Sequence, residues 1–506
     1  MGVILEDQVR SARTYPPVTS GKLHHSYVLA VWFLMTSLIL TYGFYRGQPL
    51  LYMLIALIFL VAVFPLVRNG LLGRPNDIGE PILFIAFLYL LHFGVRAIYL
   101  DHIPGDAFGA YWGVAPSYSP DVAIATLSYV IVGITAMMFG YYSSVSKSIA
   151  RMLPKSRKVF APLGRIWPIY VILILGSVGQ TVLFLSGYGT ATTGKIVIPV
   201  YLNFLQTLAS LLPIGIVLHL AMTVSSGKRL ERAASAILVL LYIITSLLQG
   251  WRGFLLSLIW MVILPIHYLQ KRVSLARFAI IGMICLLITM IILIPVLSYY
   301  RAQLVQPEAS LTDSLRLAFR SNSSDFGDSL RFVFNRMLGF DSLMLLTESH
   351  ERLWGQTLGY AILAFIPRAL WPGKPNLDVG RLFAVRFWEQ PVDVQNSISV
   401  MNIGDLLWNF DLLGVAIGML LFGLLYRVIY DYLLTRPTTS SVFIYTILFT
   451  RLINIESGVG IFLTGIVITI FTLLLTVGIV RGLGRVRMRY SQGGQIYPGY
   501  KSISGG

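Results

Sequence analysis

Residues 49–67, PLLYMLIALIFLVAVFPLV, contain no charged side chain. A helix needs about 20 mostly apolar residues to cross the hydrocarbon core of a bilayer, so this stretch predicts a membrane-spanning helix. The rest of the chain has the same character, because 56% of its 506 residues are hydrophobic and only 12% are charged. An ordinary soluble protein has roughly 25% charged residues. The sequence therefore predicts an all-α polytopic membrane protein.

Further apolar runs between polar breaks predict the other spans and bring the total to about twelve transmembrane helices. These runs are residues 27–45, 82–100, 122–142, 166–187, 199–224, 235–250, 254–269, 278–299, 412–433, 441–456 and 459–480. Residues 27–300 are thus expected to hold transmembrane helices 1–9, and residues 412–480 transmembrane helices 10–12.

The distribution of Lys and Arg predicts the orientation, since the short cytoplasmic loops of membrane proteins carry an excess of both. The basic segments are residues 143–165, 225–234, 270–277 and 481–506. Residues 101–121, in contrast, contain three Asp and no Lys or Arg. Both the N-terminus, 1–26, and the tail, 481–506, are therefore predicted to be cytoplasmic, and the Gly, Arg and Ser of the tail favour disorder. The net charge of +17 is explained by the excess of Lys and Arg in cytoplasmic segments and by attraction to anionic lipid headgroups. It does not indicate binding to nucleic acid.

Residues 301–411 form a connection long enough to fold, and the predicted topology puts it outside the cytoplasm. Its many aromatic and aliphatic residues favour a folded cap over disorder. Apolar spacing predicts helices over 325–338 and 341–354. Residues 358–366 are apolar enough to dip into the membrane before Pro367 ends the helix. We therefore predict one large, partly helical extracytoplasmic loop.

The basic residues of this loop are nine Arg and a single Lys. An Arg guanidinium grips a phosphate or carboxylate through two parallel hydrogen bonds, whereas a Lys ammonium acts as a point charge. Twelve acidic residues share the loop, so ordinary ion pairs within it are the alternative. The cations on the predicted outer side together indicate a site for an anionic ligand: Arg252, Arg301, Arg336, Arg368, Lys374, Arg381 and Arg386.

Aromatic and titratable residues near this loop each have two interpretations. The tryptophans Trp354, Trp371, Trp388 and Trp408 either stack on sugars or anchor the loop at the membrane interface. His350 is either a general base or an ordinary surface residue. Arg451 and Glu456 are costly in lipid. Either they form a mutual or interhelical ion pair, or Arg451 lines the same cavity as Arg252.

The sequence lacks the motifs of several common enzyme and metal-binding classes. The chain contains no P-loop, no HExxH and no EF-hand pattern, and its one cysteine, Cys285, lies in an apolar run. No predicted cytoplasmic loop has the size of a nucleotide-binding domain. Any transfer reaction is therefore expected on the outer side, where the activated donor has to be carried by a lipid, as in polyprenyl diphosphate-linked sugars.

Several strings resemble one known family in order and spacing. FIPRALWPGKP, Phe365 to Pro375, is similar to the Pro-Arg…Trp-Pro…Lys-Pro signature of bacterial oligosaccharide repeat-unit polymerases, the O-antigen polymerase family. IGDLLWNFDLLGVAIGMLLFG, Ile403 to Gly423, resembles its Gly-acidic…Asn-Phe-Gly…Gly element, and QGWRGFLLSL, Gln249 to Leu258, its Arg-Gly element. The resemblance covers about residues 235–430. The sequence departs from the family at Asp411, where glycine is more common, and at Asp405, where glutamate is common.

The resemblance implies a metal-independent, GT-C-like glycosyltransferase without a cofactor. It would polymerise undecaprenyl diphosphate-linked oligosaccharides on the periplasmic face of the bacterial inner membrane, with membrane lipid and a chain-length regulator protein as further partners. The residues implied for diphosphate or substrate binding are Arg252, Arg301, Arg336, Arg368, Lys374, Arg381 and Arg451. Asp405, His350 and Asp341 are the alternatives for the residue that activates the acceptor hydroxyl, and Trp371 and Trp408 are implied for sugar stacking.

Two rival functions fit the same sequence less well. A ligase of the O-antigen type would use the same donor with a lipid A–core acceptor, and the Pro-Arg/Lys-Pro motif favours the polymerase over it. A flippase for lipid-linked oligosaccharides predicts charges along both halves of the membrane domain, whereas the charges here concentrate at the outer loop.

Overall fold

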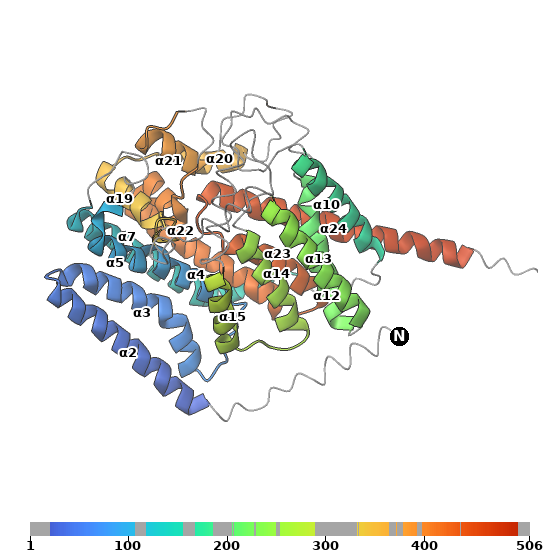
Figure 1. Ribbon diagram of the computed structural model, residues 1–506, viewed down its shortest axis with the longest axis horizontal. Coiled ribbons are helices and arrows are strands. Elements are labelled where there is room, and N and C mark those ends of the chain that lie inside the picture. Colours follow the sequence, from blue (N-terminus) through green and yellow to red (C-terminus); the bar gives the residue numbers. More distant parts are fainter. Residues whose placement is uncertain are drawn as a thin grey trace, which may run out of the picture.

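The computed structural model is all-helical wherever it describes the chain (Figure 1). The described residues are 21–106, 118–154, 167–185, 205, 207–226, 229–248, 254–288, 331, 333–363, 371, 378–391, 397–435 and 437–493. No strand occurs among them. The expected all-α fold is confirmed for this part of the chain.

Six described helices are long and apolar enough to cross a membrane. They are α3 (Pro49–Leu71), the continuous segment Pro81–His102, α7 (Pro120–Tyr142), Thr207–Val224, which includes most of α12 (Leu211–Ser226), α22 (Met401–Leu434) and Val459–Val480 of α24 (Val459–Gly493). The segment Pro81–His102 consists of α4 (Pro81–Tyr89), a π-helical turn η1 (Leu90–Val95) and α5 (Arg96–His102). Each of the six coincides with a predicted span, so a polytopic membrane protein is the fold that the structure supports.

The other predicted spans overlap helices that are shorter or more polar, and residues 289–299 of the predicted span 278–299 lie outside the described residues. Apolar stretches of 10–17 residues are Leu29–Tyr45 in α2 (Gly21–Tyr45), Trp167–Leu183 in α10 (Trp167–Leu185), Ser257–Leu269 in α14 (Phe254–Leu269), Leu275–Cys285 in α15 (Leu275–Ile288) and Thr439–Leu452, which is α23. The predicted span 235–250 falls in α13 (Arg229–Leu248), whose first turn is charged. The total of about twelve spans and a GT-C-like arrangement remain predictions.

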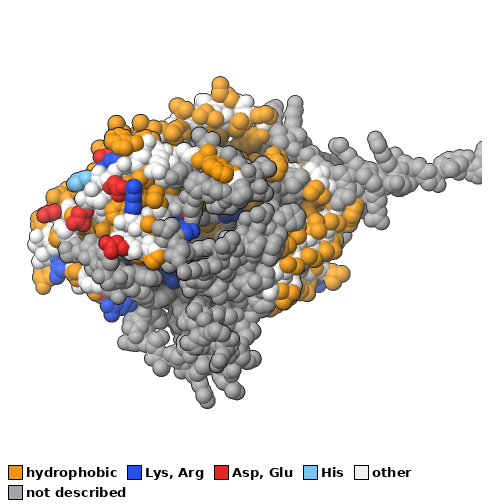
Figure 2. Space-filling view, turned by 90° about the horizontal axis from the view of Figure 1, so that it is seen from above, with side chains coloured by type: hydrophobic (Ala, Val, Ile, Leu, Met, Phe, Trp, Pro, Cys, Tyr) orange, Lys and Arg blue, Asp and Glu red, His pale blue; other side chains and the backbone are white. Residues whose placement is uncertain are grey.

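Short helices lie over one end of the bundle and belong to the predicted outer loop. They are α19 (Gly339–Ser349), α20 (Gln356–Leu363) and α21 (Val379–Phe387), close to the helices expected at 341–354 and 358–366. Figure 1 shows the three together at the top of the molecule. The side chains of Asp, Glu, Lys and Arg gather on this side in Figure 2, whereas orange apolar side chains cover much of the remaining described surface.

Two glycine contacts let α7 and α22 approach closely. A Cβ on Gly140 would overlap the carbonyl oxygen of Leu420, and a Cβ on Gly423 would overlap that of Met137. Small residues at such crossings are the usual means of packing helices in membranes, where lipid removes most of the hydrophobic driving force. The contact makes α22 and α7 a central pair around which the other helices pack.

The helix α22 is broken near its start. Phe410 has φ −139° and ψ 20°, and Asp411 has φ 55° and ψ −149°. Residues 401–409 therefore form a separate short half-helix, and all nine are buried. The predicted span 412–433 matches the long half, while the predicted loop 301–411 includes the buried half-helix.

We expect Gly423→Ala to destabilise the protein by about 1–3 kcal/mol, because the added methyl forces α7 and α22 apart. The melting temperature of the purified protein in detergent measures the effect. Gly465→Ala is the matched control in another long apolar helix, since nothing lies within 4 Å of a Cβ there. That control should gain up to about 1 kcal/mol from lower chain entropy. Equal behaviour of the two variants would contradict the proposed contact.

Candidate functional site

Arg96 and Asp341 form an ion pair in the interior, and both side chains are fully buried. Arg96 Nε lies 2.9 Å from Asp341 Oδ2, and Arg96 Nη2 lies 2.9 Å from Oδ1. The remaining guanidinium N–H groups donate to the carbonyl oxygens of Phe334 and Asp106 and to Asn335 Oδ1. All five donors of the guanidinium are thus used. Asp341, a candidate base, has both oxygens engaged by an arginine, an arrangement that favours a structural role.

Asp106 extends this cluster toward the surface from the short turn η2 (Pro104–Asp106). Its carboxylate accepts hydrogen bonds from Arg331 Nε and from the Tyr99 hydroxyl. Burial raises the pKa of Asp106, but the hydrogen bonds from Arg331 and Tyr99 outweigh burial and leave that pKa below its ordinary value.

Asp405 fixes the half-helix 401–409 in place. Its fully buried carboxylate accepts hydrogen bonds from Thr357 Oγ1 at 2.7 Å, from Asn409 Nδ2 at 2.8 Å and from the backbone N–H of Val459 at 2.7 Å. These partners belong to α20, α22 and α24. The second candidate base is therefore also held by fixed donors and has no exposed oxygen.

The aromatic candidates differ in exposure. Trp408 is fully buried, with its ring against Phe383 and Phe387 of α21. The indole ring therefore has no exposed face on which a sugar could stack, as its predicted role would require. Trp371 is 37% exposed and keeps that role open.

The third candidate base and the described cations lie at the surface of the same region. His350 follows α19 with φ 51° and is exposed. Arg336 and Arg451 are exposed and Arg381 is half-buried. Arg386 forms an ion pair with Glu351, as the alternative of ordinary pairs within the loop predicts. Arg252, Arg301, Arg368 and Lys374 lie outside the described residues.

Glu456 lies at this end of the bundle beside His92, and not beside Arg451 as the sequence suggested. No ion pair joins it to Arg451, although both residues are described; its Oε1 lies 3.5 Å from Nε2 of His92. His92 sits in the π-helical turn η1 with 9% of its side chain exposed, whereas the Glu456 side chain is 57% exposed. Asn402 is buried beside them, donating its backbone N–H to the carbonyl oxygen of Ile455.

His92, Arg96 and Asn402 were not among the predicted site residues. Nδ1 of His92 and Oδ1 of Asn402 are buried without a hydrogen-bond partner among the described residues. A π-helical turn inside an α-helix is often found at a functional site. The available signal was a histidine and an arginine four positions apart in an otherwise apolar span, because intramembrane ionisable residues are functional candidates by default. We call the end of the bundle that holds Arg96, Asp341, Asp405 and Glu456 the Arg96 end.

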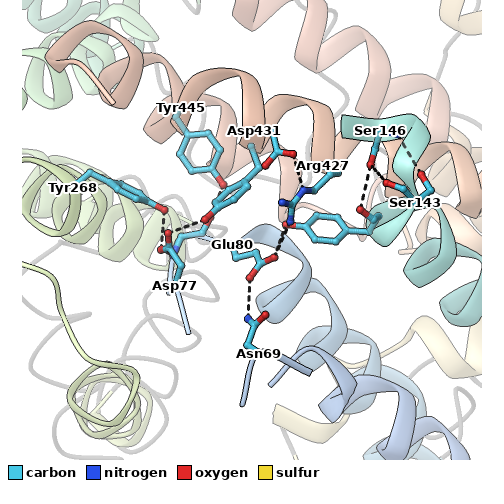
Figure 3. Close-up of polar contacts among 12 residues, drawn as sticks. Asn69, Asp77, Glu80, Ser143, Ser146, Tyr268, Arg427, Asp431 and Tyr445 are labelled. Atoms are coloured by element: carbon cyan, nitrogen blue, oxygen red, sulfur yellow. Dashed lines mark hydrogen bonds and ion pairs between the residues drawn. The ribbon is translucent and has the colours of Figure 1, made fainter. Parts of the chain in front are cut away.

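A second polar cluster occupies the opposite end, which we call the Glu80 end (Figure 3). Asp77 accepts hydrogen bonds from the hydroxyls of Tyr268 and Tyr430, each at 2.8 Å, and lies 3.1 Å from His267 Nε2. Those three side chains come from α14 and α22. Burial raises the pKa of Asp77, but these hydrogen bonds outweigh it and leave the pKa below its ordinary value.

Glu80 is the other carboxylate of the Glu80 end. It accepts hydrogen bonds from Asn69 Nδ2 at 3.2 Å, from the Tyr141 hydroxyl at 3.0 Å and from Arg427 Nη1 at 3.3 Å. Arg427 also bonds Asp431 one helical turn further on. Burial dominates here and raises the pKa of Glu80. The two carboxylates together connect α3, α7, α14 and α22.

Neither end offers an evident metal site. Within the described ranges, no three or more side chains of His, Cys, Asp or Glu come together in a way that could hold a metal ion.

A comparison with protein families gives one match. Residues 177–457, more than half of the chain, match the family described as Domain of unknown function (DUF8712). The chain belongs to this family. No curated protein and no solved structure matches it. The matched segment contains Asp341, Asp405 and Glu456, whereas Arg96 and His92, their partners, precede it. The Arg96 end is thus built jointly by the family segment and the N-terminal helices.

We expect Arg96→Met to destabilise the protein by about 3–5 kcal/mol, because it leaves the Asp341 carboxylate buried without its counter-charge. Melting temperature in detergent is the measurement, and Arg277→Met, at an exposed position, is the control. The double variant Arg96→Met with Asp341→Leu should be less destabilised than the sum of the single variants. Additive losses would show that the two residues do not act as a pair.

Asp411 gives a second prediction, because its φ of 55° and ψ of −149° cost a residue other than glycine about 1–3 kcal/mol. Its side chain offsets this through Arg352 Nη2 and the backbone N–H of Leu412, each at 2.8 Å. Asp411→Gly and Asp411→Ala both lose these bonds, but only Gly relieves the strain. The Gly variant should therefore be more stable than the Ala variant by about 1–3 kcal/mol.

The reverse order is expected at Asp121, an exposed residue in the first turn of α7. Glycine in a helix is up to about 1 kcal/mol less favourable than alanine. If Ala is the more stable substitution at both positions, the backbone of residue 411 does not require a glycine-like conformation.

Proposed function

We propose that this protein is a membrane glycosyltransferase that polymerises undecaprenyl diphosphate-linked oligosaccharide repeat units into a surface polysaccharide. The observation that carries the proposal is the gathering of exposed cations and one exposed, histidine-backed carboxylate at the Arg96 end. The Lys and Arg pattern of the sequence predicts that this end faces the periplasm. About twelve spans, a GT-C-like arrangement, cytoplasmic termini and an inner-membrane location belong to the same proposal.

The buried and exposed residues of the Arg96 end have different parts in the proposed reaction. Asp341 and Asp405 have their carboxylates fixed by buried donors, so they hold α19 and the half-helix in position. The cations proposed to bind the lipid diphosphate are Arg252, Arg301, Arg336, Arg368, Lys374, Arg381 and Arg451. Cations placed at the departing group stabilise a diphosphate electrostatically.

Glu456 is the proposed general base in place of Asp341 and Asp405, whose carboxylates are held by buried donors, and the exposed His350 stays the alternative. The Glu456 side chain is exposed and lies beside His92, whose ring orients it. Glu456 takes the proton of the acceptor hydroxyl, and the hydroxyl oxygen forms a bond to the anomeric carbon of the donor glycan. The bond from that carbon to the diphosphate oxygen breaks, and undecaprenyl diphosphate leaves with the electron pair. No further reactant is needed to balance the transfer.

Two alternatives remain. An O-antigen-ligase-like transferase would use the same site with a lipid A–core acceptor. A lipid-linked oligosaccharide flippase would need polar groups on both sides of the membrane, and the buried polar cluster at the Glu80 end supplies them on the second side, although in a closed network.

The test is reconstitution of the protein in liposomes with a defined undecaprenyl diphosphate-linked repeat unit. A ladder of longer glycans is expected from the wild type, and Arg368→Ala should abolish it. Glu456→Gln should lower the rate by at least about 100-fold, the usual contribution of a general base. Glu348→Gln, at an exposed position of α19, is the matched control and should retain the wild-type rate.

The competing functions give different products in the same liposomes. Translocation of the lipid-linked unit without lengthening would replace the polymerase with the flippase. A single transfer that occurs only when a lipid A–core acceptor is added would replace it with the ligase.

A further inference from the structure

An apolar groove opens between α2, α3 and α7, away from the Arg96 end and next to the Glu80 end, since its wall residue Tyr142 packs against Tyr141. Its volume is about 540 Å³. Trp32 of α2, Phe64 of α3, and Phe139 and Tyr142 of α7 form much of its wall. All three helices belong to predicted membrane spans, so the groove faces the hydrocarbon region. A wall of this composition suits a hydrocarbon chain and offers little to water.

Two hydrogen-bond donors of the wall residues have no partner among the described residues. Trp32 Nε1 and the Tyr142 hydroxyl are shielded from solvent and make no hydrogen bond to any described residue. A polar group left unpaired in this way costs about 1–3 kcal/mol. The ester carbonyl oxygens of a glycerolipid are acceptors, whereas a polyprenyl chain contains none. Because both donors are shielded from solvent, they reach an acceptor only when side chains of the wall move around a bound lipid, and an ester-linked lipid supplies that acceptor.

The guanidinium of Arg68 lies beside the groove. The guanidinium carbon of Arg68 lies 4.2 Å from the centre of the Tyr142 ring. Within the described part of the chain Arg68 forms no ion pair with a carboxylate, so its charge is available to a ligand. A lipid phosphate is the group that accompanies an acyl chain and complements this charge.

The short helix α8 (Ser144–Met152) marks the level of the membrane surface at this point. It begins directly after Ser143, which lines the groove and caps the helix by accepting a hydrogen bond from Ser146 N. The exposed apolar residues Val145, Ile149 and Met152 recur at helical spacing along it, and Lys147 and Arg151 are its cations. This pattern is typical of a helix that lies in the headgroup region of an anionic membrane.

We infer that the groove between α2, α3 and α7 binds one anionic glycerophospholipid. An acyl chain lies along Phe64 and Phe139, ester carbonyls accept hydrogen bonds from Trp32 and Tyr142, and the phosphate lies at Arg68 near α8. The lipid comes from the leaflet at the Glu80 end. This site is separate from the Arg96 end and does not depend on the proposed glycosyltransferase activity.

The first experiment measures lipid retention by native mass spectrometry of the purified, delipidated protein in detergent. Phosphatidylglycerol should bind at one site, more tightly than phosphatidylethanolamine of the same acyl composition. Arg68→Gln should weaken phosphatidylglycerol binding about five-fold, since a basic residue near a membrane surface contributes about 1 kcal/mol of affinity for anionic lipid. The matched control is Arg74→Gln, at an exposed loop position, which should bind as the wild type does.

The second experiment needs no variant with altered charge. Phosphatidylglycerol with brominated acyl chains should quench part of the tryptophan fluorescence of the wild type, and this part should be absent in Trp32→Phe. Equal binding of the two phospholipids, preference for undecaprenyl phosphate, or quenching that persists unchanged in Trp32→Phe would each overturn the inference.

Discussion

The buried ion pair between Arg96 and Asp341 is the constraint on which the architecture of the Arg96 end depends. A charge in an apolar bundle is tolerated only where its hydrogen-bonding groups are satisfied, because desolvation costs several kcal/mol per ion. Arg96 meets this condition with donors to α19, to Phe334 and Asn335 before it, and to Asp106. The Arg96 guanidinium, in the segment Pro81–His102, therefore fixes the position of α19 against the bundle. Since Asp341 belongs to the DUF8712 segment and Arg96 does not, the pair also joins that segment to the N-terminal helices.

The helix α22 connects the two ends of the bundle and is fixed by contacts at each of them. Its half-helix 401–409 is held by Asp405 through α20 and α24, and its long half packs on α7 through Gly140 and Gly423. At the far end Arg427 and Tyr430 bond the carboxylates of the 72–80 connection. The break at Asp411 lets the short half turn into the interior while the long half continues through the bundle. A glycine at this position would meet the same backbone requirement without the Arg352 bond.

The apolar runs of the sequence were sufficient to locate the long helices, because membrane spans depend on local composition. The roles of the polar residues depended on partners that no local pattern reveals. Asp341 is a candidate base by its sequence, and no local pattern shows that its carboxylate pairs with Arg96, 245 positions away. Trp408 was a candidate for sugar stacking, but residues of α21 cover its ring. Glu456 was first considered with Arg451, a close neighbour in the chain, whereas the fold pairs it with His92 in the third predicted span. Burial and pairing are thus the properties that a sequence of this kind leaves open.

The Glu80 end bears on the choice between an enzyme and a transporter. Six hydrogen bonds to the carboxylates of Asp77 and Glu80 come from α3, α7, α14 and α22. Hydrogen bonds to charged groups contribute about 1.5–3 kcal/mol each, so opening this end would be costly unless new partners formed. A flippase would have to open it in every cycle, because alternating access exposes the site to both sides of the membrane. A glycosyltransferase whose donor and acceptor both approach from the Arg96 end requires no such opening. The closed network of the Glu80 end is therefore more consistent with chemistry at the opposite end than with transport through the bundle.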